Sequence, residues 1–200
     1  KDIGDDRADA NYNTMGAYAQ LNIAATGSNR GLYPSYLYYA YIKNVNDIIG
    51  ILAPQENLDA GKKAILGQCY AYRALYYLDL VQIMEWKKPT DTRYKWVDPK
   101  LGPDALVNLG VPIVTDETPA EQLSNNPRAK VDEVYDLILS DLGKAEGLLD
   151  GFVRTDKVQP DLGVVYGLYA RAYLNLASRV KTAAPYKDEG DYWTEGARRV

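Results

Sequence analysis

One continuous apolar stripe between Arg128 and Leu149 is the feature that most constrains the fold. Read as a helix, this segment places apolar side chains at steps of three and four residues, at Val131, Tyr135, Ile138, Leu142, Ala145 and Leu149. The charged residues of the segment, Asp141 among them, are expected to lie mostly off this stripe. Asp132 and Glu133 fall in the first turn, where negative charge favours the helix dipole. The segment therefore predicts a long amphipathic helix with one face in a core.

The same reading predicts further helices on both sides of this one. They are expected at about residues 15–25, 34–52, 60–85 and 160–180, and from residue 191 to the end. Pro34 is expected to open one helix and Ala53-Pro54 to stop it. Asp59 is a suitable N-cap for the next helix, and Pro160 is expected to occupy the first helical position of a later one. The chain is therefore expected to be all-α.

Residues 86–127 break the helical pattern. Six prolines fall in this stretch, which makes a long helix improbable, and residues 110–115 suit a short extended piece. A loop of this length inside a compact domain usually has a function or covers something.

Two of the expected helices resemble each other at a spacing of 96 residues. Each carries a face of small residues, Gly67, Ala71, Ala74, Leu78 and Val81 in the first and Gly163, Gly167, Ala170, Leu174 and Ala177 in the second. Small side chains let a neighbouring helix approach closely, as in stacked helical repeats. The likeness is either a true repeat or the chance similarity of two bundle helices.

Composition favours binding over catalysis. The chain has 200 residues, a net charge of −4, no histidine and one cysteine. The negative charge argues against nucleic acid as a partner, and the absence of histidine removes the commonest general base and metal ligand. Cys69, among apolar residues, is expected to be a buried and inert thiol. The chain has no run of eighteen apolar residues, so no transmembrane helix is predicted. We therefore expect no catalytic residue, no metal and no cofactor.

Aromatic and amide side chains supply the candidate ligand contacts. The chain has eighteen tyrosines and one phenylalanine, and a tyrosine serves either in a half-buried helix seam or on a surface that stacks against sugar rings. Residues 26–36 form a turn-like segment that combines hydrogen-bonding groups with aromatic rings, and its candidates are Asn29, Arg30, Tyr33 and Tyr36. The alternative is a packed loop before a helix. Trp96, in a polar aromatic segment, is either a binding edge or an anchor for the loop.

Paired carboxylates raise the question of glycoside hydrolysis, for which two positioned acids are the chemical minimum. The evident pairs are Asp5/Asp6 and Asp116/Glu117. Adjacent residues in flexible segments rarely take opposed acid and nucleophile roles, so neither pair predicts an active site. The N-terminal aspartates lack the glycine and terminal glutamate of an EF-hand loop, which favours a solvated acidic segment over a calcium site.

Four passages in order give the chain a family likeness. They begin with Tyr39-x-x-Ile42-x-x-x-Asn46 and the segment from Gly67 to Leu80 that contains Arg73-Ala74. Gly110-Val-Pro112 follows, and Arg128 then leads into the helix of the opening stripe and later to Tyr169-Ala-Arg171-Ala. Over residues 39–176 the chain resembles the N-terminal part of the SusD/RagB family, which are outer-membrane nutrient-binding lipoproteins of Bacteroidota.

The resemblance implies a fold, a function and partners. The fold would be an α-α superhelix of tetratricopeptide-like helical hairpins with long irregular loops. The function would be non-catalytic capture of a glycan, or in some members a peptide, at the cell outer membrane by a surface-exposed lipoprotein. The partners would be an oligosaccharide ligand and a SusC-like TonB-dependent transporter.

The chain departs from the family pattern in three places. Lys130 stands where a serine or threonine cap is usual, and the lipidated cysteine expected near the mature N-terminus is absent, so any lipid anchor lies outside this chain. Whole members also continue well beyond the length of this chain. Residues 1–200 are therefore expected to be one SusD-like N-terminal helical domain within a longer chain. Two other hypotheses remain open: a helical-repeat adaptor that binds a protein partner, and a glycan-active enzyme.

Overall fold

The computed structural model describes residues 29–85 and 108–178, with side chains from residue 35 onward. The chain divides into two units, Lys1–Tyr41 and Ile42–Val200. Of the first unit, the described part is the start of one helix. The helices expected near residues 15–25 and 191–200, and the candidate Trp96, lie outside the described residues.

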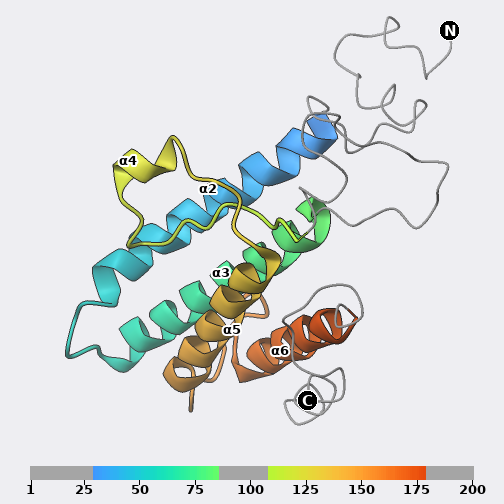
Figure 1. The fold of residues 1–200 in the computed structure, drawn as a ribbon. Coiled ribbons are helices and arrows are strands. Elements are labelled where there is room, and N and C mark those ends of the chain that lie inside the picture. The colour runs from blue at the N-terminus through green and yellow to red at the C-terminus, as the bar shows by residue number, and fades with distance from the viewer. Residues whose placement is uncertain (1–28, 86–107, 179–200) are drawn as a thin grey trace, which may run out of the picture. The chain divides into compact units, whose positions relative to one another are not determined.

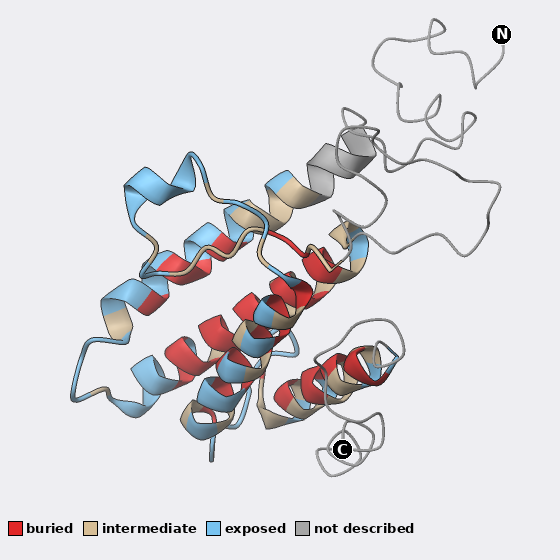
Figure 2. Ribbon diagram, viewed as in Figure 1, coloured by how far each residue is buried: buried red, intermediate tan, exposed pale blue. Residues whose placement is uncertain are grey.

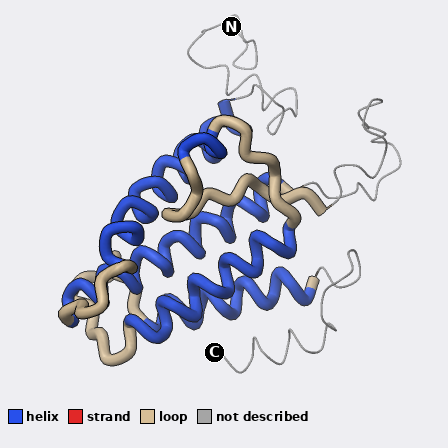
Figure 3. Tube along the Cα trace, turned by 60° about the vertical axis from the view of Figure 1, so that its left-hand side comes forward, coloured by secondary structure: helices blue, strands red, loops and turns tan. Residues whose placement is uncertain are grey.

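The described residues are helical and hold no strand. The helices are α2 (Asn29–Leu52), α3 (Ala60–Met84), the short α4 (Ala120–Leu123), α5 (Val131–Leu148) and α6 (Leu162–Ala177), as Figure 1 shows. Apart from the helices, one isolated antiparallel bridge joins Leu109 to Lys130 within this part of the chain. The connections are tan in Figure 3, and the stretch from residue 108 to α5 is interrupted by the short α4. The all-α prediction is confirmed.

Local sequence signals explain where most helices begin. Asp59 caps α3 by accepting a hydrogen bond from the Lys62 backbone N–H at 2.8 Å, as predicted. Lys130 at the start of α5 has no side-chain acceptor, and Glu133 instead accepts from the Lys130 backbone N–H at 2.7 Å.

Two predicted helix starts were wrong. α2 begins at Asn29, five positions before Pro34, so the segment expected to be turn-like is helical from Asn29 onward. A proline near a helix start fits the helical φ and removes only one backbone hydrogen bond, so it does not have to mark the boundary. α6 begins at Leu162 with Asp161 as its cap, which accepts from the Val164 N–H at 3.1 Å, so Pro160 precedes the helix.

Helix α3 is the centre of the unit that follows Tyr41. α5 packs on α3, and α6 packs on both α5 and α3. Buried positions cover most of the circumference of α3, whereas α5 and α6 each bury one face (Figure 2). The six residues of the opening stripe, from Val131 to Leu149, are all buried as predicted.

Gly67 explains how closely α3 and α5 approach. A Cβ built on Gly67 would lie 2.8 Å from Leu149 Cγ and 3.0 Å from Leu148 Cβ, closer than real side chains pack. The close approach predicted at this face of α3 is therefore confirmed at Gly67, where a larger residue would push α3 and the end of α5 apart.

The corresponding prediction for α6 was wrong. Gly163, Gly167 and Leu174 are exposed, and within the described residues nothing lies within 4 Å of a Cβ built on Gly167. α6 instead buries Val165, Leu168, Tyr169, Ala172 and Leu176, together with Ala177 of the predicted face. The first five stand 98 positions after Gly67, Tyr70, Ala71, Ala74 and Leu78, all of them buried on α3. The burial pattern thus repeats two residues out of the register that the glycines suggested.

Candidate functional site

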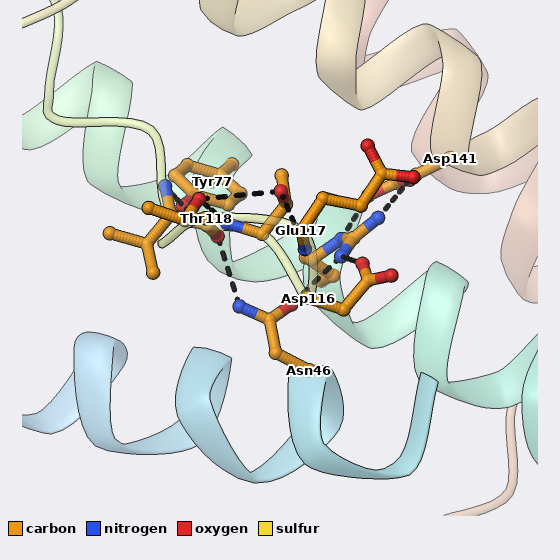
Figure 4. Close-up of polar contacts among 9 residues, drawn as sticks. Asn46, Tyr77, Asp116, Glu117, Thr118 and Asp141 are labelled. Carbon is orange, nitrogen blue, oxygen red and sulfur yellow. Dashed lines mark hydrogen bonds and ion pairs between the residues drawn. The ribbon is translucent and has the colours of Figure 1, made fainter. Parts of the chain in front are cut away.

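The most elaborate polar arrangement in the described residues surrounds Arg73, in the middle of α3. Its Nε donates to Asp141 Oδ2 at 2.7 Å and its Nη2 donates to Asp141 Oδ1 at 2.8 Å, which makes a two-bond pair between α3 and α5. Its Nη1 donates to Asn46 Oδ1 on α2 and to Asp116 Oδ1 on the long connection, both at 2.8 Å. Figure 4 shows these side chains converging on one guanidinium. One arginine therefore joins four segments of the chain.

Burial makes these contacts energetically important. The side chain of Arg73 is 2% exposed, that of Asp141 is 0% exposed and that of Asp116 is 17% exposed. Burial opposes the charge on Arg73, but the hydrogen bonds and charges of Asp141 and Asp116 outweigh it and raise the pKa of Arg73 above its ordinary value. A buried pair of this kind adds little net stability when intact, and loss of one partner leaves an uncompensated charge.

The segment that carries Asp116 is held on both sides. We call residues 111–118 the strap. The Tyr77 hydroxyl of α3 accepts from the Val114 N–H at 2.7 Å and donates to the Val114 carbonyl at 2.9 Å. Asn46 Nδ2 of α2 donates to the same carbonyl at 3.0 Å. Val114 is thus bound to α3 and α2 at once, which fixes the strap between them.

Local turns and a second arginine complete the support of the connection. The Thr115 backbone N–H donates to Thr118 Oγ1 at 2.8 Å, and Asn126 Nδ2 donates to the Ile113 carbonyl at 2.7 Å. Arg128 Nε donates to the Gly110 carbonyl at 2.6 Å, and Nη2 donates to the Leu109 carbonyl at 2.9 Å and to the Met84 carbonyl at the end of α3 at 2.6 Å. The connection from residue 108 to α5 is therefore tied to α3 at three residues, Arg73, Tyr77 and Met84.

The sequence reasoning missed this cluster. Asp141 was expected off the apolar stripe, but it is fully buried on it, because it stands three residues after Ile138 and four before Ala145 and so shares their face. A signal was available in Arg73, a charge that shares the apolar face of the predicted helix with Tyr70, Ala74 and Tyr77. A charge in that position requires a carboxylate on a facing element.

The carboxylates Asp116 and Glu117 do not form a hydrolytic pair. Asp116 is bound to Arg73, and Glu117 is exposed. The Glu117 backbone N–H donates to Thr115 Oγ1 at 3.3 Å. One acid is thus occupied by a structural ion pair, and nothing here opposes the two across a substrate-sized gap.

The predicted ligand-contact residues are placed as follows. Asn29, Arg30, Tyr33 and Tyr36 all belong to the first turns of α2, where positions 29, 33 and 36 fall on one side of the helix. The Tyr36 side chain is 76% exposed, as a contact residue requires. Trp96 lies outside the described residues, so its place relative to the α2 candidates stays a prediction.

Several tyrosines serve in helix seams. Tyr72 stacks on Tyr76 in α3 and Tyr169 stacks on Tyr173 in α6, with ring centroids 5.9 and 6.0 Å apart. Tyr70 lies under the charged groups of Arg73 and Lys144, 5.3 and 5.0 Å from its ring centroid. The tyrosine-rich composition is therefore explained in part by packing.

The described residues contain no group of three or more cysteine, aspartate or glutamate side chains placed to hold a metal ion. Among the described helices, none combines the length and the apolar character needed to cross a membrane.

Comparison with known proteins shows which family and which solved structure this chain is similar to. Residues 4–174 match the model of a SusD-like family described as "Starch-binding associating with outer membrane". A comparison with curated proteins gives no match. Among solved structures, a SusD-like carbohydrate binding protein from Bacteroides vulgatus ATCC 8482 matches with a TM-score of 0.59 and 24% identity. The match covers 83% of this chain and 29% of that protein, so the chain spans less than a third of its length.

Proposed function

Because this chain belongs to the SusD-like family, we propose that the protein captures a glycan at the outer membrane without transforming it. The observation that carries the proposal is the family match over residues 4–174, which includes every described helix up to most of α6. The fold agrees, since a SusD-like carbohydrate binding protein shares it.

Absence of catalysis is part of the proposal. The chain has no histidine, and its one cysteine is 5% exposed with a pKa raised to about 11 by burial. The described acidic residues near the strap are either paired with Arg73 or exposed singly. These features support a ligand that stays intact while it is bound, and stacking and hydrogen bonding are the contacts we propose for it.

Delivery to a partner completes the proposed role. We infer that a lipid anchor outside this chain holds the full-length protein on the cell surface, and that a SusC-like TonB-dependent transporter receives the ligand. Co-purification of the tagged full-length protein with a transporter encoded beside it supports this part, and recovery of the protein without the transporter from detergent-solubilised outer membranes contradicts it.

Ligand contact is tested on the α2 candidates. In affinity electrophoresis of the full-length protein through gels containing soluble starch or another glycan, Tyr33→Ala, Tyr36→Ala and Trp96→Ala are expected to weaken retardation. Each lost stacking contact is expected to reduce affinity by about 2- to 13-fold, because aromatic contacts contribute about 0.5–1.5 kcal/mol beyond the buried area.

A matched control separates this from general damage to the helix. Tyr41→Ala removes another exposed tyrosine of α2, which is 41% exposed and lies on a different side of the helix from Tyr36. It is expected to leave migration unchanged. Unchanged migration of all three candidate variants, with the wild-type protein retarded, rejects these residues as contacts; release of shorter products from the glycan rejects the non-catalytic role.

A further inference from the structure

A non-helical segment takes part in attaching the second part of α2 to the rest of its unit. Among the described helices, α3, α5 and α6 pack on one another, whereas α2 begins in the other unit of the chain. Yet the part of α2 that follows Tyr41 is well covered, with Ile42 and Ile49 at 0% exposed, Asn46 at 6% and Val45 at 8%. The strap is one element that lies against this part of α2.

The described polar links between α2 and α3 run through Asn46, directly to Arg73 and by way of the strap. Asn46 accepts from Arg73 Nη1 and donates to the Val114 carbonyl, so its one side chain binds both α3 and the strap. On the next turn of α2, a Cβ built on Gly50 would lie 3.6 Å from Asp116 Cβ, which puts the strap against the helix itself. Figure 4 shows Asn46 reaching up from α2 to these partners.

Asp116 is the contact in this arrangement that water reaches most easily. Arg73 already has a fully buried carboxylate in Asp141, and Asp116 is its second carboxylate, with 17% of its side chain exposed. Loss of Asp116 therefore leaves Arg73 neutralised and α3 joined to α5. Val114 remains bound to Tyr77, so the strap would loosen first at its Asp116 end.

We propose that the strap, held by Asp116 on Arg73, is a latch that docks residues 42–52 of α2 onto α3, and that the strap and this part of α2 open together as one unit. The bundle of α3, α5 and α6 stays closed when the latch opens. This proposal concerns the fold of the chain and does not depend on which ligand the protein binds.

Hydrogen–deuterium exchange on the full-length protein tests the latch. Asp116→Ala is expected to speed amide exchange in the strap and in residues 42–52 by on the order of ten- to a hundred-fold, the factor for losing a hydrogen bond to a charged group. Exchange in the buried parts of α3 and α5 is expected to match the wild type. Asp116→Asn keeps an acceptor oxygen without the charge, and the same regions are expected to change by a smaller factor.

The control is Glu117→Ala, which removes the neighbouring exposed carboxylate and leaves the Arg73 contacts intact. It is expected to exchange as the wild type does. Faster exchange in the strap with residues 42–52 unaffected shows that the two do not open together and overturns the proposal. A parallel increase throughout α3 and α5, or no change in either Asp116 variant, overturns it as well.

Discussion

Gly67 offers the sharpest test of the packing described here. Gly67→Ala adds one methyl group where Leu149 Cγ would lie 2.8 Å away and Leu148 Cβ 3.0 Å away. Neither atom is the mobile end of a long side chain, so α3 and the end of α5 must separate. Overpacking of this kind costs about 1–3 kcal/mol in free energy of unfolding. Alanine is also more favourable than glycine in a helix interior by about 0.8–1.0 kcal/mol, and this difference partly offsets the loss in free energy of unfolding.

A second glycine removes this ambiguity. Gly167 lies inside α6, and no described atom comes within 4 Å of a Cβ built on it. Gly167→Ala therefore receives the helix-propensity gain without the steric cost. The gain is common to both variants, so Gly67→Ala is expected to be less stable than Gly167→Ala by about 1–3 kcal/mol.

Urea denaturation of the two variants measures this difference. With an m-value of about 2 kcal/mol per molar urea, a difference of about 2 kcal/mol separates the midpoints by about 1 M. The comparison holds only if the m-value is the same in both variants. Equal midpoints, or a higher midpoint for Gly67→Ala, would refute the close approach of α3 and α5 at Gly67.

Two further predictions follow from burial. Arg73→Ala is expected to cost about 3–5 kcal/mol in free energy of unfolding, because Asp141 stays buried without its partner. Arg171→Ala is expected to cost about 1 kcal/mol or less, because the side chains of Arg171 and its partner Asp79 are 41% and 22% exposed. Equal losses of stability for the two variants in urea denaturation contradict this. Cys69, whose pKa burial raises to about 11, is expected to resist a thiol reagent at pH 8 in the folded protein and to react fully in denaturant; rapid labelling under native conditions contradicts the burial.

The sequence was sufficient for the parts of the fold that repeat a simple physical pattern. The stripe from Val131 to Leu149 and the cap at Asp59 follow from helix periodicity and from unpaired N–H groups, both of which are local. Which face of α6 is buried was not predictable in this way. Its glycines suggested the wrong face, because small residues permit close packing but do not require it.

The polar cluster was hidden for a related reason. Asp141 was expected off the stripe because of its charge, although its position between Ile138 and Ala145 places it on the buried face. The charge is tolerated there only because Arg73, 68 positions earlier, supplies two hydrogen bonds. A partner that distant in sequence cannot be deduced from the periodicity of either helix alone.

Arg73 and Arg171 show that position in the helix stack determines the role of a residue. Each precedes a buried alanine, and the two stand 98 positions apart, in the register that aligns the buried faces of α3 and α6. Arg73 lies on the central helix, with elements on both sides, and binds three segments beyond its own. Arg171 lies on α6, which in the described residues packs on α5 and α3 from one side, and its half-exposed side chain contacts only Asp79 and Gln82 there. The same Arg-Ala sequence thus supports a buried junction in one helix and a partly solvated contact in the other, because burial depends on how many neighbours a helix has. A motif match identifies the helix type, and only the packing around it shows whether its arginine holds the structure together.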